Sequence, residues 1–187
     1  MSRLNLPRVI ALCGDAGSGK TTAADYMVEH YGYRRVKFAD PLKNMLRAMG
    51  LTERQIEGDQ KETAQDALCG RSPRHLMQTL GTEWGRNCIG ENLWINLWRE
   101  RVNFLLSDGE SVIVDDMRFS NELDAATSVG AHVYRLRRPG QANKAGDHAS
   151  EMGLAFAVLP VIINDGDLPS LYHSVIHRLF PGDPARA

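Results

Sequence analysis

The stretch "GDAGSGKTT" (residues 14–22) follows an apolar run, "VIALC" (residues 9–13), and precedes a segment with helical periodicity. It fits the pattern G-x-x-x-x-G-K-[ST], whose fixed positions are filled by Gly14, Gly19, Lys20 and Thr21. In such a loop the backbone N–H groups point inward, and the following helix adds unpaired amides and the positive end of its dipole. The alternative is a glycine-rich turn that merely joins a strand to a helix. The strand before it and the helix after it favour a phosphate-binding loop (P-loop).

The residues of this loop have separate expected roles. Lys20 would reach the β- and γ-phosphates of a nucleotide, and the hydroxyl of Thr21 would bind Mg²⁺. The next helix has apolar residues at helical spacing from Ala24 to Tyr31 and is expected to end at Gly32. We therefore expect the nucleotide to be held by Gly14, Asp15, Ala16, Gly17, Ser18, Gly19, Lys20, Thr21 and Thr22.

The composition limits the classes of protein to consider. With 187 residues, 43% of them hydrophobic, the chain can bury one sizeable core, so a single domain with small insertions is expected. The 22 basic and 23 acidic residues leave a formal net charge of −1, which argues against a general binder of polymeric nucleic acid. Cys13, Cys69 and Cys88 form no C-x-x-C pair, so we expect free thiols in a reducing cytosol. Neither a signal peptide nor an apolar run of about 18 residues is evident, so we expect a cytoplasmic protein.

Short apolar runs alternate with helical patterns along the chain. Strands are expected at about 8–13, 33–38, 111–115, 131–136 and 160–163. Helices are expected from Asp40-Pro41 to Gly50, behind Ser72-Pro73, from Trp94 to Leu105 and from Leu171 to Leu179. This alternation predicts an α/β fold of three layers, the P-loop NTPase fold, in which a five-stranded, mainly parallel sheet carries helices on both faces.

A second chemical pattern is "SVIVDDMRFSNE" (residues 111–122), a buried strand that ends in two carboxylates. An acid beside the P-loop strand is where such enzymes organise Mg²⁺ or its waters. Side chains alternate in direction along a strand, so Asp115 and Asp116 face one site together only if the strand has ended. The structural alternatives are that Asp116 starts a turn and that Ser120 or Asn121 caps the next helix.

The acceptor side of the site is expected after the second strand. Asp40, in the box "FADPLK", is predicted as a helix N-cap whether or not it also contacts substrate. In "SPRHLMQTLGTEWGR" (residues 72–86), Arg74, Gln78 and Thr82 recur every four residues, so one helix face could present a guanidinium, an amide and a hydroxyl. A guanidinium suits a monophosphate, and an amide suits a base edge. The alternative is a solvated polar face.

A third region, "RLRRPGQANKAGDHASE" (residues 135–151), follows a strand and is rich in glycine, alanine and polar residues. Arg137 and Arg138 could belong to a lid at about 137–150 that brings positive charge to the transferring phosphoryl group and excludes water. The alternative is a solvated basic patch. His148 and Glu151 are expected to make a cap or lid contact rather than hold a metal.

Two further boxes, "HASE" (residues 148–151) and "IINDG" (residues 162–166), complete the set. With the P-loop, "FADPLK", "SPRHLMQTLGTEWGR" and "DDMRFSNE", they resemble the phage-type deoxynucleoside monophosphate kinases over about residues 8–180. The resemblance implies a nucleoside monophosphate kinase-like fold and transfer of the γ-phosphoryl group of ATP to a deoxynucleoside monophosphate, with Mg²⁺. The chain lacks the aspartate-glycine-phenylalanine-proline-arginine box of the adenylate kinase-like pattern and has "DDMRF" there instead. The division of work between Asp115 and Asp116 therefore stays open.

On this basis we expect a single P-loop kinase domain (residues 1–187), with a helical substrate-binding region at about 41–107 and ATP and Mg²⁺ as cofactors. The expected catalytic residues are Lys20, Arg137, Arg138 and Asp116. The expected metal residues are Thr21, Asp115 and Asp116. Substrate contacts are expected from Asp40, Lys43, Lys61, Arg74, Gln78, Thr82, Glu83, Arg86, Arg118, Asn121 and Glu122.

Other functions stand as alternatives. One is a different small-molecule kinase resembling dephospho-coenzyme A kinase, and another is a nucleotide-dependent switch or assembly NTPase. A switch would be expected to carry an Asn-Lys-x-Asp motif, which this sequence lacks, and a polynucleotide end kinase is disfavoured by the missing basic excess. The expected partners are small-molecule nucleotides, with no polymeric nucleic acid and no membrane, in the host cytoplasm if a phage encodes the chain. The accepted bases, the tolerance of ribose and the formation of a homodimer stay open.

Overall fold

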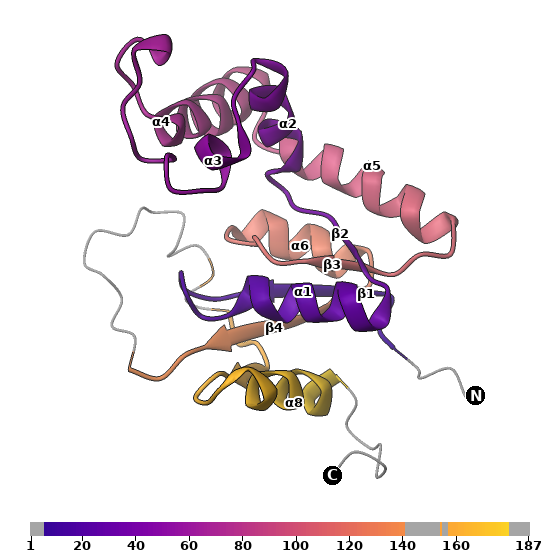
Figure 1. Ribbon diagram of the computed structural model, residues 1–187. Coiled ribbons are helices and arrows are strands. Elements are labelled where there is room, and N and C mark those ends of the chain that lie inside the picture. Colours follow the sequence, from indigo (N-terminus) through magenta and orange to yellow (C-terminus); the bar gives the residue numbers. More distant parts are fainter. Residues whose placement is uncertain (1–5, 141–153, 155–156, 180–187) are drawn as a thin grey trace. The chain divides into compact units, whose positions relative to one another are not determined.

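The computed structural model describes residues 6–140, 154 and 157–179 (Figure 1). The chain divides into two compact units. We call Met1–Lys37 with Arg99–Ala187 the sheet unit, and Phe38–Trp98 the helical unit. The helical region expected at about 41–107 overlaps the helical unit, and its assignment to the substrate stays a prediction. Among the described residues, no helix combines the length and the apolar character that a membrane span requires.

The sheet unit is built on five parallel strands in the order β2-β3-β1-β4-β5. Each strand lies where an apolar run predicts it: β1 (Val9–Cys13), β2 (Arg34–Arg35), β3 (Val112–Val114), β4 (His132–Arg137) and β5 (Val161–Ile163). The central strand is β1, in which Ile10 pairs with Ile113 of β3 on one side and His132 of β4 on the other. All five residues of β1 are buried, as expected for a strand covered on both faces.

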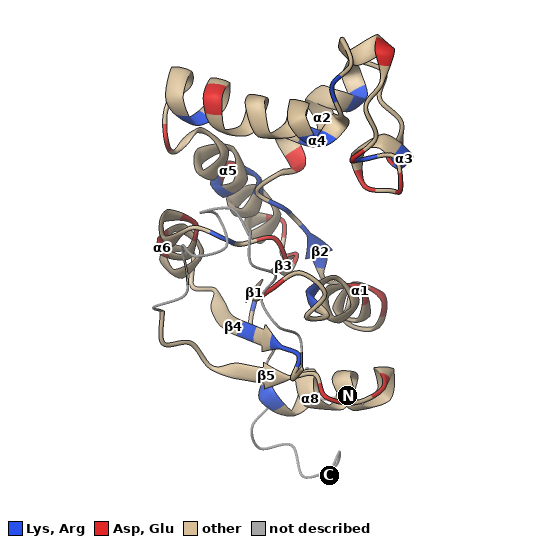
Figure 2. Ribbon diagram, turned by 90° about the vertical axis from the view of Figure 1, so that its left-hand side faces the viewer, with Lys and Arg blue, Asp and Glu red and all other residues tan. Residues whose placement is uncertain are grey.

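Helices cover both faces of this sheet, which confirms the predicted three-layer α/β fold (Figures 1 and 2). On one face lie α1 (Lys20–Tyr31) and α8 (Leu168–Leu179). On the other lie α6 (Ser120–Ser128) and residues 99–107 of α5 (Leu93–Ser107). As predicted, α1 ends at a glycine, because Gly32 adopts a left-handed conformation (φ 71°) that closes the helix.

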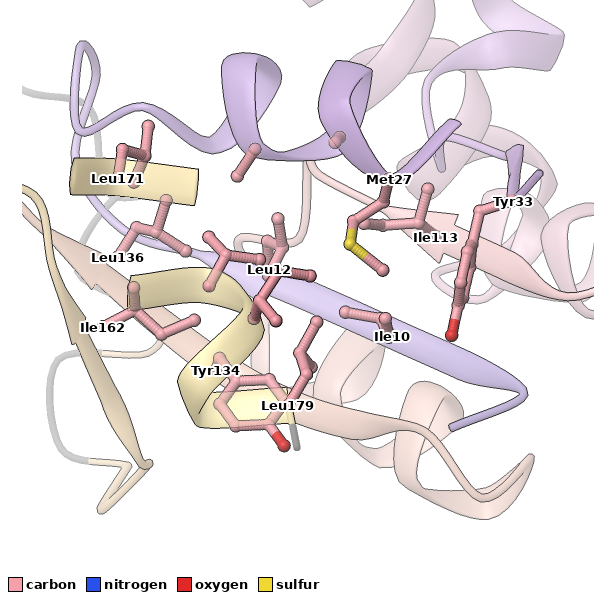
Figure 3. Close-up of a cluster of buried hydrophobic side chains, with 14 residues drawn as sticks. Ile10, Leu12, Met27, Tyr33, Ile113, Tyr134, Leu136, Ile162, Leu171 and Leu179 are labelled. Atoms are coloured by element: carbon pink, nitrogen blue, oxygen red, sulfur yellow. The ribbon is translucent and has the colours of Figure 1, made fainter. Parts of the chain in front are cut away.

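An apolar cluster joins the sheet to α1 and α8 (Figure 3). Ile10 and Leu12 project from β1, and Met27 and Leu171 meet them from the two helices. These side chains are at most 2% exposed. The burial of these side chains stabilises the packing of the two helices on the sheet, mainly through the hydrophobic effect. The carboxyl ends of the strands are therefore held in fixed positions.

The helical unit contains short helices around a second apolar cluster. They are α2 (Asp40–Ala48), α3 (Glu53–Ile56), the 3-10 helix η1 (Asp66–Leu68), α4 (Pro73–Gln78), the π-helix η2 (Thr79–Ile89) and the first part of α5. The cluster comprises Leu42, Leu46, Leu51, Ile56, Met77 and Trp94. The prediction of Asp40 as an N-cap is wrong, because the N-cap of α2 is Ala39 and Asp40 is the first residue of the helix. The negative charge of Asp40 in this first turn interacts favourably with the positive end of the helix dipole.

The helix predicted behind Ser72-Pro73 starts as expected and then changes its winding. The hydroxyl of Ser72 accepts a hydrogen bond from the backbone of His75 at 3.2 Å, a regular helix start. After Gln78 the chain continues as the π-helix η2, in which Gly90 N bonds Gly85 O at 3.0 Å. A π-helix has more residues per turn than an α-helix. Arg74 and Gln78 belong to α4 and Thr82 to η2, so the winding changes within the helix face that we predicted the three to share, and that face stays a prediction.

Trp94 of α5 supports the wide helix. Its indole Nε1 donates a hydrogen bond to Gly81 O at 2.8 Å. Its ring lies against Gly85, where an added Cβ atom would come within 2.4 Å of Trp94 Cζ2. The two glycines, four residues apart, therefore leave a recess on the helix surface that the indole fills, which we call the seat.

This seat gives a matched pair of substitutions. We expect Gly85→Ala to lower the free energy of unfolding by about 1–3 kcal/mol, because the new methyl group overlaps the Trp94 ring. Gly81→Ala is the control, since its methyl group would meet Leu42 at an ordinary 3.4 Å and alanine favours a helix by up to about 1 kcal/mol. Urea denaturation followed by tryptophan fluorescence measures both. Equal losses of unfolding free energy in the two variants would contradict the proposed packing of Trp94 against Gly85.

Candidate functional site

The P-loop joins β1 to α1 in a conformation that only glycine adopts readily. Gly14, Gly17 and Gly19 have positive φ angles of 136°, 77° and 100°. Space is short as well: a Cβ atom on Gly14 would lie 2.2 Å from Leu136 O, and one on Gly19 would lie 2.6 Å from Asn164 Nδ2. The loop is thus closely packed against the ends of β4 and β5.

Lys20, the first residue of α1, folds back over this loop. Its Nζ donates hydrogen bonds to Gly14 O at 2.6 Å and to Asp15 O at 2.8 Å. Burial is the main cause that lowers its pKa, and the positive charge of Arg118 is the second. Arg118, from the "DDMRF" box, therefore acts electrostatically on the P-loop lysine. A bound anion would relieve the repulsion between the two cations.

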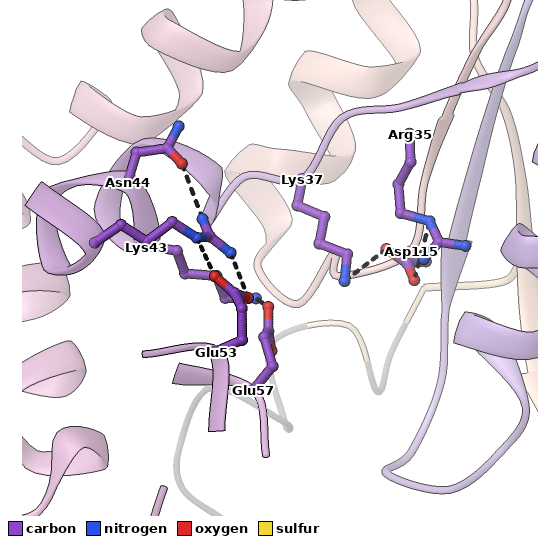
Figure 4. Close-up of polar contacts among 8 residues, drawn as sticks. Arg35, Lys37, Lys43, Asn44, Glu53, Glu57 and Asp115 are labelled. Atoms are coloured by element: carbon purple, nitrogen blue, oxygen red, sulfur yellow. Dashed lines mark hydrogen bonds and ion pairs between the residues drawn. The ribbon is translucent and has the colours of Figure 1, made fainter. Parts of the chain in front are cut away.

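Asp115 follows β3 and is the buried acid of the site. It is 4% exposed, and neither carboxylate oxygen accepts a hydrogen bond from the described residues. Its charged neighbours are Arg35, with Nε 3.9 Å from Oδ2, and Lys37, with Nζ 3.8 Å from Oδ1 (Figure 4). Arg35 also bonds Asp25 at 2.5 Å and Thr21 O at 3.3 Å, which links the carboxylate to α1. A buried carboxylate with unused acceptor capacity suits a cation or its waters.

A pocket of about 490 Å³ opens beside the P-loop within the sheet unit. Its polar lining includes Lys20, Arg138 and Asn164, and its apolar lining comes from Leu168 and Leu171 at the start of α8. The rest of the lining is Gly17, Gly19, Thr21, Thr22, Gly166 and Asp167. The volume is within the range of small-molecule sites, and the lining joins positive charge to apolar surface.

Asn164 was not among the residues that sequence reasoning assigned to the site. Its side chain donates a hydrogen bond from Nδ2 to Ser18 O at 3.0 Å, and both residues are buried. The hydroxyl of Ser18 is itself buried without a hydrogen-bond partner among the described residues. Arg35 and Lys37, beside Asp115, were also missed. The available sign for Asn164 was its position at the carboxyl end of the last strand, in the box "IINDG".

The two arginines expected in the lid have different surroundings. Arg137 is the last residue of β4 and Arg138 is the next residue; both are exposed, and of the two only Arg138 lines the pocket. Pro139 and Gly140 follow as a turn. The rest of the expected lid, with His148 and Glu151, lies outside the described residues.

Several of the expected substrate residues have partners inside the protein, and Glu122, Lys43 and Arg74 are examples. Glu122 Oε2 accepts hydrogen bonds from the backbone N–H groups of Arg118 (2.7 Å) and Phe119 (3.1 Å), so it caps the start of α6. Lys43 is buried and forms an ion pair with Glu57 at 2.5 Å, which Figure 4 shows. Arg74 Nε bonds Glu62 Oε1 at 2.8 Å in a half-exposed pair. A role in substrate binding stays a prediction for all three.

The other expected substrate residues differ mainly in exposure. The exposed ones are Gln78, Thr82, Glu83 and Arg118. The half-buried ones are Asp40, Lys61, Arg86 and Asn121, and of the expected metal residues Asp116 is also half-buried. Their roles stay predictions too.

Comparison with known proteins identifies relatives over most of the chain. A family model described as deoxynucleotide monophosphate kinase matches residues 52–175. A putative deoxynucleotide monophosphate kinase of Acanthamoeba polyphaga mimivirus is 32% identical over 184 residues, which cover 90% of this chain and 94% of that protein. The deoxynucleotide monophosphate kinase of Enterobacteria phage T4 is 28% identical over 239 residues, covering 92% and 98%.

Solved structures with a similar backbone have lower sequence identity to this chain than the viral relatives have. Dephospho-CoA kinase from Campylobacter jejuni is 11% identical with a TM-score of 0.48, covering 91% of this chain and 94% of that one. A gluconokinase from Sinorhizobium meliloti 1021 is 15% identical with a TM-score of 0.45, covering 94% and 95%.

The different surroundings of Arg137 and Arg138 make them a matched pair for ligand binding. We expect Arg138→Ala to raise the dissociation constant of ATP by about tenfold or more, because its guanidinium lines the pocket. Arg137→Ala should change that constant by less than about threefold, since this side chain is exposed and does not line the pocket. Isothermal titration calorimetry on both variants makes the comparison. Small effects in both would mean that the pair is a solvated basic patch.

Proposed function

The chain belongs to the deoxynucleotide monophosphate kinase family, and on that premise we propose that it transfers the γ-phosphoryl group of ATP to a deoxynucleoside monophosphate, giving the diphosphate and ADP. The observation that carries the proposal is the P-loop with Lys20 bonded across it, beside a buried acid and a pocket, in a chain of this family. Its partners in the reaction are small nucleotides.

The donor side of the reaction lies in the sheet unit. The P-loop amides and the ammonium of Lys20 would hold the phosphates of ATP, and the start of α1 adds the positive end of its dipole. The pocket that continues toward Leu168 and Leu171 has the size and apolar surface to take the nucleoside part. Arg138, at the edge of that pocket, would neutralise charge that develops on the transferring group.

The residues also fit Mg²⁺. Asp115 has two buried oxygens without hydrogen-bond partners among the described residues, and Thr21 is an exposed hydroxyl at the start of α1. We assign the metal to Thr21 and Asp115, and we give Asp116, the other acid expected there, a role toward the acceptor. When bound, Mg²⁺ neutralises charge on the β- and γ-oxygens of the donor. Arg35 and Lys37 lie 3.9 and 3.8 Å from the Asp115 carboxylate and partly compensate its charge.

The acceptor is proposed to bind through the polar residues of the helical unit. Arg74 and Arg86 supply guanidinium groups for its monophosphate, and Gln78 supplies an amide for the base. Asp40, Lys43, Lys61, Thr82 and Glu83 complete the proposed set in the helical unit. Arg118, Asn121 and Glu122 are proposed substrate residues of the sheet unit. Asp116 is proposed to orient the attacking oxygen. Catalysis then consists of positioning and electrostatic stabilisation, which is what phosphoryl transfer requires.

A substrate panel tests the proposed function. With ATP and Mg²⁺, deoxynucleoside monophosphates should give diphosphates and ADP, whereas free nucleosides should give no product, because the arginines would then lack a phosphate. Chromatography of the products measures both. Lys20→Ala should lower turnover by roughly 10²–10³ while the protein stays folded. Comparable rates with a nucleoside and its monophosphate would contradict the proposal.

The two adjacent acids allow the metal assignment to be tested. We expect Asp115→Asn to raise the Mg²⁺ concentration needed for half-maximal activity and to lower turnover by about 10². Asp116→Asn should lower turnover while leaving the Mg²⁺ dependence close to that of the parent chain, since we give it the acceptor role. Initial rates measured as a function of Mg²⁺ concentration distinguish the effects of the two substitutions. A change in Mg²⁺ dependence only for Asp116→Asn would reverse the assignment.

A further inference from the structure

We propose that Asn164 is a positioning residue: it fixes the orientation of the Ser18–Gly19 peptide and thereby aims the Gly19 N–H group at the phosphate site. The inference rests on the proposed function only in that the P-loop must bind the phosphates of a nucleotide. Asn164 touches no reacting atom in this role. It acts through the loop.

The first step is that Asn164 is itself held firmly. It follows β5 directly, and its backbone N–H donates to Arg137 O of β4 at 2.9 Å, which extends the hydrogen bonding between the two strands. The residue is 6% exposed. The sheet, rather than a loop, therefore sets the position from which its amide reaches Ser18 O.

The second step follows from the geometry of the peptide bond. A peptide unit is planar and trans, so its C=O and N–H groups point in opposite directions. The Asn164 amide bonds Ser18 O at 3.0 Å and draws that carbonyl toward β5. The N–H of Gly19, in the same peptide unit, must then point away from β5. Rotation of this unit would direct the Ser18 carbonyl toward the phosphates, where its partial negative charge repels them.

The third step is that the contact between Asn164 and the loop requires a glycine at position 19. Gly19 has a φ of 100°, and an added Cβ atom would lie 2.6 Å from Asn164 Nδ2. The amide can approach the loop only because residue 19 has no side chain. Ser18 is 1% exposed, so its carbonyl is shielded from bulk water and would be left without a donor if the amide were lost.

The experiment compares substitutions of Asn164 with one of its exposed neighbour. Asn164→Ala removes the donor, and Asn164→Asp replaces it with a group of the same shape that repels the Ser18 carbonyl when ionised. Asp165→Asn is the matched control, since it changes a charge in the same turn and leaves the amide intact. Dissociation constants are measured for ATP, inorganic tripolyphosphate and adenosine, and thermal unfolding is followed for each variant.

We expect both Asn164 variants to bind ATP and tripolyphosphate at least about tenfold more weakly, with adenosine binding changed by less than about threefold. Asp165→Asn should match the parent chain with all three ligands. Tripolyphosphate has no base or ribose, so its loss of affinity reports the phosphate site alone. A variant that is merely less stable would not separate tripolyphosphate from adenosine.

Three results would overturn the inference. Unchanged tripolyphosphate binding with weaker adenosine binding would make Asn164 a direct nucleoside contact, and unchanged binding of both would leave it without a role in the site. Failure of both Asn164 variants to fold, with Asp165→Asn folded, would assign the residue to the fold. Because no acceptor is present, a chain that binds tripolyphosphate but phosphorylates no monophosphate would contradict the proposed function and leave this inference standing.

Discussion

The close approach of neighbouring strand ends to the two ends of the P-loop is the constraint on which the site depends. Leu136 O of β4 lies where a side chain on Gly14 would be, and the Asn164 amide lies where one on Gly19 would be. The loop is therefore shaped by the ends of two strands as well as by its own sequence. With the loop held in this way, Lys20 can bond back across it, and its ammonium stays beside the pocket.

Much of this architecture could be predicted from the sequence, because the deciding patterns are local. Apolar runs of a few residues marked all five strands, and the helix stop at Gly32 follows from a conformation that glycine adopts freely. The P-loop could be identified because its residue types seldom occur at this spacing except where a loop binds phosphate. Of the candidate site, the sequence indicated Lys20, Asp115 and Arg138, each of which lies in the loop or directly follows a strand.

The features that escaped prediction depend on partners distant in the sequence. An asparagine after a strand resembles any turn residue until Ser18, far earlier in the chain, is seen to accept its hydrogen bond. The π-helix was missed because helical periodicity assumes a constant winding, whereas Trp94 on Gly81 and Gly85 supports a wider one. For Glu122, the sequence did not reveal that the carboxylate accepts hydrogen bonds from the backbone at the start of its own helix, and its role in substrate binding stays a prediction. Sequence boxes indicate where a site lies better than they indicate the task of each residue.

The strand order also has a consequence for the order in which the chain can fold during synthesis. Among the described strands, β1 has β3 and β4 as its neighbours, and Ile10 has its partners at Ile113 and His132. The first strand to leave the ribosome therefore waits for roughly 100 further residues before it can form a ladder. The helical unit, whose apolar cluster lies wholly within residues 38–98, can collapse in that interval. Until β3 arrives, the apolar run of β1 stays unpaired, so the nascent chain is most open to aggregation between the completion of the helical unit and the synthesis of the middle of the sheet.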